Sequence, residues 1–243
     1  GLKCVHDTVE SSAVVEAGPA RVKVVIPSDP PPPPGGLSIR PSDDRVVQEE
    51  RLHMHKIPAV KAFARANGLN RFVLKGGEKP TLGIVAACKA YLDVRQALDD
   101  LGIDEVKAQR LGIRLLKIGM VWPLEESVVK DFAKGLSTIM VVEEKRSLIE
   151  AQLRDILYAE ASRPAVIGKP DEQGNTLFAP HGVLEPNQIA RAIATRIQDR
   201  ATSECAAALQ DQSLARNQAD LVARIPYFCA GCPHNSSTVL PDG

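Results

Sequence analysis

Apolar and polar positions follow a regular rhythm through the middle of this 243-residue chain. Three times, at residues 82–87, 114–119 and 138–142, a short apolar run is followed by a stretch with helical spacing. Such runs are typical of parallel strands that are buried on both faces and joined by crossover helices. The pattern predicts an α/β fold with a three-layer, Rossmann-like parallel sheet. A fourth run at residues 165–168 is expected to close the sheet.

The spacing of apolar residues also predicts the helices around this sheet. Three helices are expected to follow the strands, at residues 91–101, 124–136 and 147–159. Three more are expected before and after them, at residues 46–67, 185–197 and about 202–222. Asn67-Gly68 is a typical helix stop, since both residues tolerate a left-handed backbone.

The segment before the first predicted helix contains two further patterns. Residues 20–26 alternate between apolar and polar or small side chains, which predicts a strand. Residues 29–36 contain five prolines followed by two glycines, a composition that favours an extended polyproline path. We interpret this second stretch as a linker into the main domain.

Composition narrows the classes of function. The 30 basic and 30 acidic residues cancel, and 4% of residues are aromatic, so nucleic-acid binding is not expected. No apolar run approaches the ~20 residues that a membrane-spanning helix requires. Five unevenly placed cysteines do not form a disulfide framework in a chain of this length, which indicates a reducing cytoplasm. With 44% hydrophobic residues the chain is expected to be a soluble globular protein.

Ligands of such sheets usually bind at the carboxyl ends of the strands. Those ends are predicted at Ala87-Cys88, Gly119-Met120 and Glu143-Glu144, and none carries a complete dinucleotide or phosphate-loop motif. Gly76-Gly77 lies before the first predicted strand, whereas the glycines of a phosphate loop follow the strand. Glu143 and Glu144 either complement the positive end of the next helix or serve a domain interface or cofactor. Trp122-Pro123 is interpreted as a strand-to-helix turn with an aromatic plug.

Near the C-terminus the chain reads Cys229-Ala-Gly-Cys232-Pro-His234. Two thiolates and one imidazole cannot fill a four-ligand metal or cluster shell without a further partner. Three interpretations of the cysteines remain open: a turn without a ligand, half of a ligand set, or a redox disulfide. His234 is either a polar surface residue or a site residue.

Five segments together resemble one family, the long, fused indolepyruvate ferredoxin oxidoreductases. They are LKCVHDTVE at residues 2–10, KAYLDVRQAL at 89–98, GMVWPL at 119–124, VVEEKR at 141–146 and PYFCAGCPHN at 226–235. The similarity runs over essentially the whole chain and places it in the middle of those proteins. The chain is therefore expected to be an internal fragment.

The resemblance implies an enzyme that oxidatively decarboxylates indolepyruvate with thiamine diphosphate and Mg, iron–sulfur clusters, coenzyme A and ferredoxin. It implies a pyrimidine-binding domain tail with linker at residues 1–45, a transketolase C-terminal-like domain at 46–200, and a helix with the start of a pyrophosphate-binding domain at 201–243. The fragment alone is expected to be inactive, to bind no cofactor and to have partly ordered ends. The full-length parent is expected to be a homo-oligomer.

The resemblance also implies roles for four residues. Cys229 and Cys232 correspond to two thiolate ligands of a cluster near thiamine, and His234 and Glu143 are candidate cofactor-binding residues. Many relatives have glycine where this chain has Pro233-His234, so His234 is also considered as facing the diphosphate or the substrate. Two alternatives are kept: a non-catalytic scaffolding or dimerisation domain, and a zinc or redox module built on Cys229, Cys232 and His234.

Overall fold

The computed structural model describes residues 12, 14–197, 199, 202–207 and 228–239. Its centre is a five-stranded sheet in the order β1-β3-β2-β4-β5. The strands are β1 (Arg71–Lys75), β2 (Leu82–Ala87), β3 (Ile113–Ile118), β4 (Thr138–Val142) and β5 (Ala165–Ile167). Strands β2 to β5 run parallel to one another. The four strands predicted from the apolar runs are confirmed, and with them the α/β class.

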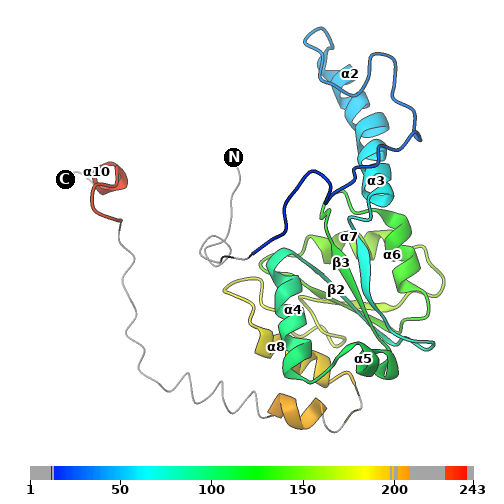
Figure 1. The fold of residues 1–243 in the computed structure, drawn as a ribbon, viewed down its shortest axis with the longest axis vertical. Coiled ribbons are helices and arrows are strands. Elements are labelled where there is room, and N and C mark those ends of the chain that lie inside the picture. Colours follow the sequence, from blue (N-terminus) through cyan, green and yellow to red (C-terminus); the bar gives the residue numbers. More distant parts are fainter. Residues whose placement is uncertain (1–11, 13, 198, 200–201, 208–227, 240–243) are drawn as a thin grey trace.

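Helices cover both faces of the sheet (Figure 1). The helices between and after the strands are α4 (Cys88–Asp100), α5 (Glu105–Leu111), α6 (Glu126–Ala133), α7 (Ile149–Leu157) and α8 (Pro186–Ala194). One apolar core joins the sheet to α4, α5 and α8, and a second joins it to α6 and α7. All six residues of β2 are buried, as expected for a central strand with helices on both faces. This is the predicted three-layer arrangement.

Gly83 shows how closely the second helical layer packs on β2. A Cβ atom at Gly83 would lie 2.5 Å from Leu136 Cδ1 and 2.8 Å from the Phe132 ring, which is fully buried. Only a residue without a side chain therefore allows α6 and the turn after it to approach β2 this closely.

Two short elements were not predicted from the sequence. Strand β1 pairs antiparallel with β3 at the edge of the sheet, with a register shift between Phe72 and Leu74. Of its five residues only Leu74 is buried, so its apolar signal is weak. Helix α5 has seven residues and is capped by Asp104, whose side chain accepts a hydrogen bond from Lys107 N at 2.7 Å.

A long helical arm precedes the sheet. It consists of α2 (Arg45–Glu50), the π-helical segment η1 (Arg51–Lys56) and α3 (Ile57–Ala66), and it agrees with the predicted helix at residues 46–67. The arm projects away from the sheet (Figure 1). Asp44 begins it by accepting hydrogen bonds from Val46 N and Val47 N at 2.8 and 3.0 Å. We call residues 45–66 the arm from here on.

The predicted strand at residues 20–26 was wrong. This segment is exposed and forms no strand, although Val25 exchanges two hydrogen bonds with the Asn67 side chain at 2.8 and 2.7 Å. Alternation alone does not make a strand, because backbone groups also need a partner edge. The predicted helix at 202–222 lies mostly outside the described residues, of which 202–207 are helical. Within the described part, no helix is long and apolar enough to cross a membrane.

Candidate functional site

The candidate site lies where the carboxyl ends of β2 and β4 meet. These strands are hydrogen-bonded neighbours, from Leu82 opposite Thr138 to Ala86 opposite Val142. The helix after β2, α4, packs on one face of the sheet, whereas α7 after β4 packs on the other. Such a reversal is the topological switch point at which open α/β sheets bind ligands. The sequence predicted the strand ends correctly, and the topology brings two of them together.

An ion network ties the two strand ends together. Lys89 donates to Asp93 Oδ2 at 2.9 Å and lies 3.4 Å from Glu144 Oε1. The same Glu144 oxygen accepts from Leu184 N at 3.3 Å, and Lys89 contacts Leu184 O at 3.5 Å. Burial works to lower the pKa of Lys89, but Asp93 and Glu144 outweigh it and raise the pKa above its ordinary value. The ammonium group is therefore held charged between β2, β4 and the loop that precedes α8.

Glu143 is buried and its carboxylate begins α7. Its two oxygens accept hydrogen bonds from the backbone N–H groups of Leu148, Ile149 and Glu150 at 3.0, 2.9 and 3.1 Å. These groups have no partner within the helix, so the carboxylate satisfies three donors at the positive end of α7. The contacts agree with the helix-end interpretation of Glu143. A role for Glu143 in cofactor binding stays a prediction.

Lys169, which follows β5, contacts the same edge of the sheet. Its ammonium group donates to the backbone oxygen of Glu143, and its backbone N–H donates to Glu150 Oε2 at 2.8 Å. Burial lowers the pKa of Lys169, while the nearby charges of Glu143, Glu150 and Glu144 oppose that effect. A Cβ atom at Gly168 would lie 2.5 Å from the same Glu150 oxygen, so glycine is needed where the chain passes this carboxylate.

Two residues at the switch point have a strained backbone. Cys88 begins α4 with φ 49°, and Lys145 follows the β4 end with φ 59°. Positive φ is unfavourable for residues with a side chain and is kept only where surrounding contacts enforce it. Lys145 is fixed by donating to Gly182 O at 2.6 Å. The Cys88 residue is exposed, so its thiol is on the accessible side of this edge.

The end of β3 is organised by Asn70, which directly precedes β1. Asn70 Oδ1 accepts hydrogen bonds from Gly119 N and Met120 N at 3.0 and 3.1 Å. Asn70 Nδ2 is buried and has no partner among the described atoms. A Cβ atom at Gly119 would collide with the backbone oxygen of Leu69, so glycine permits the close approach. Trp122 is 58% exposed, so the expected aromatic plug at this turn was wrong.

The base of the arm is joined to the start of α6 by two ion pairs. Arg65 donates to Glu125 Oε1 through two nitrogens at 3.1 and 2.8 Å, and Lys61 pairs with Glu126. Glu125 also accepts from Ser127 Oγ and from the backbone N–H groups of Ser127 and Val128. Burial alone would raise the pKa of Glu125, but these hydrogen bonds hold it below its usual value.

The cysteine motif forms a turn in which Cys229 is exposed and Cys232 is half-buried. Cys232 N donates to Cys229 O at 3.0 Å, and Cys232 Sγ lies 3.2 Å from His234 Nδ1. The ring of His234, the first residue of the short helix α10 (His234–Ser237), stacks on Phe228 with centroids 5.1 Å apart. Among the described residues, no three His, Cys, Asp or Glu side chains gather as a metal site. A ligand role for Cys229 and Cys232 stays a prediction.

Sequence reasoning missed Lys89, Asp93 and Lys169. Lys89 stands two positions after the first apolar run, and Lys169 directly follows the fourth. A usable signal was present, because Lys89 and Asp93 are four residues apart at the start of a predicted helix, where such pairs face each other.

Comparison with known proteins points to one family. The model of the indolepyruvate oxidoreductase domain matches residues 72–220. The chain is 29% identical over 197 residues to indolepyruvate oxidoreductase subunit IorA of Methanothermobacter marburgensis, and 26% identical over 196 residues to the same subunit of Methanothermobacter thermautotrophicus. Each match covers 81% of this chain but only 28% of the relative.

Two solved structures show weaker similarity. A split-gene transketolase, in an inactive β4 tetramer, aligns with a TM-score of 0.35 and 13% identity over 58% of this chain and 41% of its own. A 2-oxoglutarate:ferredoxin oxidoreductase from Magnetococcus marinus aligns with a TM-score of 0.43 and 17% identity over 66% of this chain and 24% of its own.

Proposed function

The chain belongs to the indolepyruvate oxidoreductase family, and from this premise we propose that it is an internal α/β part of a longer oxidoreductase. The reaction proposed for that longer protein is the oxidative decarboxylation of indolepyruvate or a related aryl 2-oxo acid, with coenzyme A as acyl acceptor and ferredoxin as electron acceptor. The observation that carries the proposal is the family match, which begins inside β1 and extends beyond α8.

We assign the domains as the sequence suggested. Residues 46–200 form the transketolase C-terminal-like unit, residues 1–45 belong to a preceding pyrimidine-binding domain with its linker, and residues 201–243 lead into a pyrophosphate-binding domain. The sheet and the helices from α4 to α8 support the central assignment, because all of them fall between residues 46 and 200 and share two cores.

The residues present fit the implied cofactors only in part. When bound, thiamine diphosphate with Mg supplies an electron sink for decarboxylation, and an iron–sulfur cluster carries single electrons. Cys229 and Cys232 would hold two positions of such a cluster, since both belong to one exposed turn, and further thiolates would have to come from elsewhere. His234, 3.2 Å from Cys232 Sγ, would lie beside the cluster or the diphosphate.

The carboxyl edge of the sheet favours a second, compatible function for this part of the protein, that of a scaffold. Its charged groups are engaged in internal contacts: Lys89 with Asp93 and Glu144, and Glu143 with the start of α7. Groups committed in this way fix loops and domain surfaces. We therefore propose that residues 46–200 position neighbouring domains and subunits, and that the 243-residue chain alone is inactive.

The decisive experiment uses the full-length protein purified without oxygen. Iron and thiamine are quantified, and indolepyruvate-dependent reduction of ferredoxin or a viologen dye is measured in wild type and in the double variant Cys229→Ala/Cys232→Ala. The matched control is Cys205→Ala, which removes a half-buried thiol outside the motif. Loss of iron and of dye reduction in the double variant, with neither lost in the control, supports both the reaction and the ligand role.

Other results separate the remaining possibilities. Activity with unchanged iron in the double variant removes the two cysteines from the cluster but keeps the reaction. Absence of indolepyruvate-dependent reduction in wild type leaves the scaffold function. Tight stoichiometric zinc binding by the isolated 243-residue chain, lost in Cys229→Ala/Cys232→Ala, would instead favour the zinc module.

A further inference from the structure

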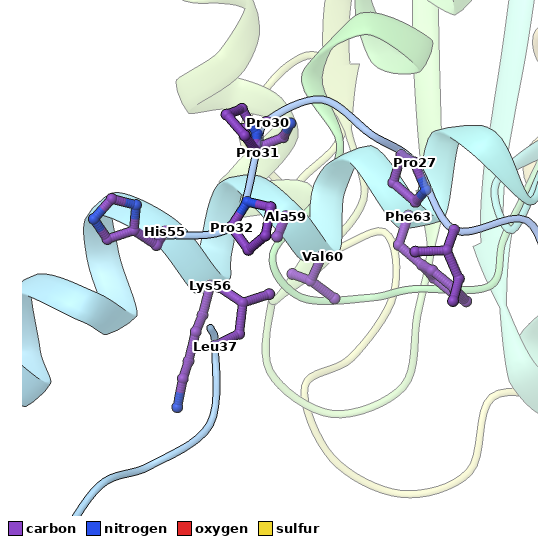
Figure 2. Close-up of a pocket in the computed structure, with 11 residues that line it drawn as sticks. Pro27, Pro30, Pro31, Pro32, Leu37, His55, Lys56, Ala59, Val60 and Phe63 are labelled. Atoms are coloured by element: carbon purple, nitrogen blue, oxygen red, sulfur yellow. The ribbon is translucent and has the colours of Figure 1, made fainter. Parts of the chain in front are cut away.

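A cavity of about 330 Å³ separates the arm from the proline-rich segment that crosses it. We call residues 26–37 the strap. Figure 2 shows Pro30, Pro31 and Pro32 of the strap standing over Ala59, with Val60 and Phe63 farther along the same helix. Proline has no N–H to donate, so the wall formed by the strap offers an occupant mainly apolar contact.

The charged groups at this cavity have one sign. Among the described residues, His55 and Lys56 are the only titratable side chains that line it, and none of its lining residues carries a carboxylate. Lys56 runs beside Leu37 and directs its ammonium group away from the prolines (Figure 2). The cavity therefore suits an apolar side chain that enters between strap and arm and is followed by a carboxylate at the basic rim.

Exposed apolar side chains extend along the arm beyond the cavity. Six of the large hydrophobic residues that are exposed in the described parts of the chain belong to the strap or the arm: Ile26, Val46, Val47, Leu52, Met54 and Val60. Only Ile26 and Val60 of these line the cavity. The others are spread over a longer stretch than a small ligand would cover, which fits a polypeptide instead.

The outer half of the arm lacks a core of its own. Neither α2 nor η1 has a buried residue. Arg51 holds the outer half to the strap by a 2.9 Å hydrogen bond to Gly36 O, and it also contacts Asp43 at 3.2 Å. The ion pairs to the start of α6 hold only the base. Helices of about a dozen residues are marginal in water without tertiary packing. The outer half of the arm thus has the character of an uncovered interface.

We propose that strap and arm are the docking surface for another part of the same polypeptide, which inserts an apolar side chain into the cavity and places a carboxylate near His55 and Lys56. The inference rests on the proposed longer protein. The chain spans 28% of the length of the IorA relatives, so proteins of this family contain ample additional polypeptide to cover the surface. Interfaces between domains of one chain are of this mixed apolar and charged kind.

Amide hydrogen exchange tests the proposal, with the 243-residue chain compared against the full-length protein. Exchange over residues 45–66 is expected to slow about tenfold or more in the full-length protein, because covered helices open less often. Exchange in β2 and β4 should be similar in both. In Val60→Glu, which puts a carboxylate into the cavity wall, the protection of the arm should be lost in the full-length protein.

The control variant is Val106→Glu, which makes the same change on α5 at a residue that is 75% exposed. Equal exchange of the arm in both proteins, or equal loss of protection in the control, overturns the proposal. So does protection in the 243-residue chain that rises with its concentration, since that assigns the surface to a second copy. A native polypeptide of only 243 residues, detected by an antibody, also overturns it. Exchange requires no activity, so failure of the indolepyruvate assay with a protected arm would reject the proposed reaction alone.

Discussion

Removing the Glu143 carboxylate should destabilise the domain substantially, and the size of the effect can be estimated from its contacts. In Glu143→Ala three backbone N–H groups at the start of α7 lose their acceptor. Loss of an N-terminal cap costs ~1 kcal/mol, and hydrogen bonds to a charged group contribute ~1.5–3 kcal/mol each, although they are not additive. Because water can reach part of the vacated space, we expect a loss of ~2–4 kcal/mol in the free energy of unfolding.

Urea unfolding of the 243-residue chain, followed by far-ultraviolet circular dichroism, measures this loss. Glu143→Gln retains one accepting oxygen and should lose about half as much. Glu49→Ala, an exposed change on the arm, is the control and should unfold within about 0.5 kcal/mol of wild type. In thermal unfolding, the alanine variant should melt ~4–16 °C lower, since ~2–4 °C corresponds to 1 kcal/mol at this chain length.

A loss below about 0.5 kcal/mol in Glu143→Ala would refute the helix-capping argument. The carboxylate would then be free for another use, and the cofactor role predicted for Glu143 would gain weight. If the loss is as large as expected, a cofactor contact would have to compete with three backbone donors that already occupy both oxygens.

Three further predictions concern Glu125, Lys89 and Gly119. The pKa of Glu125 is lowered on folding, so its stabilisation is present above its unfolded pKa and lost as pH falls through the folded pKa. In urea titrations at a series of pH values, Glu125→Gln should therefore lose less stability at acidic pH than wild type does. The pKa of Lys89 is raised, so its stabilisation is present below its unfolded pKa and lost as pH rises through the folded pKa. Lys89→Met should remove that alkaline dependence, whereas Lys79→Met, at an exposed position, should preserve it. Gly119→Ala should lower stability by ~1–3 kcal/mol because its Cβ meets a backbone oxygen, whereas Gly18→Ala, with open space around it, should be close to neutral by calorimetry.

The central strands could be predicted because a strand that is buried on both faces requires a continuous run of apolar or small residues. In β2 every residue from Leu82 to Ala87 is buried, so every position had to be apolar or small. Strand β1 could not be predicted in the same way, since its position is set by antiparallel pairing with β3 and only Leu74 is buried. The strand expected at residues 20–26 failed for the complementary reason, as it has the alternation without a partner edge.

The position of the candidate site at the strand ends could be predicted from the sequence, but its side-chain contacts could not. The order of the strands in the sheet decides which strand ends become neighbours, and the hydrophobic pattern of the sequence does not contain that order. Once β2 lies beside β4, Lys89 comes within reach of Glu144, 55 residues later in the chain. Trp122 illustrates the same limit. A single aromatic residue after a strand suggests a buried side chain, but Trp122 is 58% exposed.

The switch point and the cysteine turn differ in how far their polar groups find partners within this chain. At the switch point the charges are matched within the chain, because Lys89 meets two carboxylates and Glu143 meets a helix end. For the cluster proposed at the cysteine turn, Cys229 and Cys232 would supply two of four ligands, and the His234 imidazole lies 3.2 Å from Cys232 Sγ. A network complete in itself is suited to holding a domain together, whereas an incomplete ligand set depends on other segments. The two regions therefore support a division in which residues 46–200 provide the framework and the chemistry is assembled where further polypeptide meets the turn.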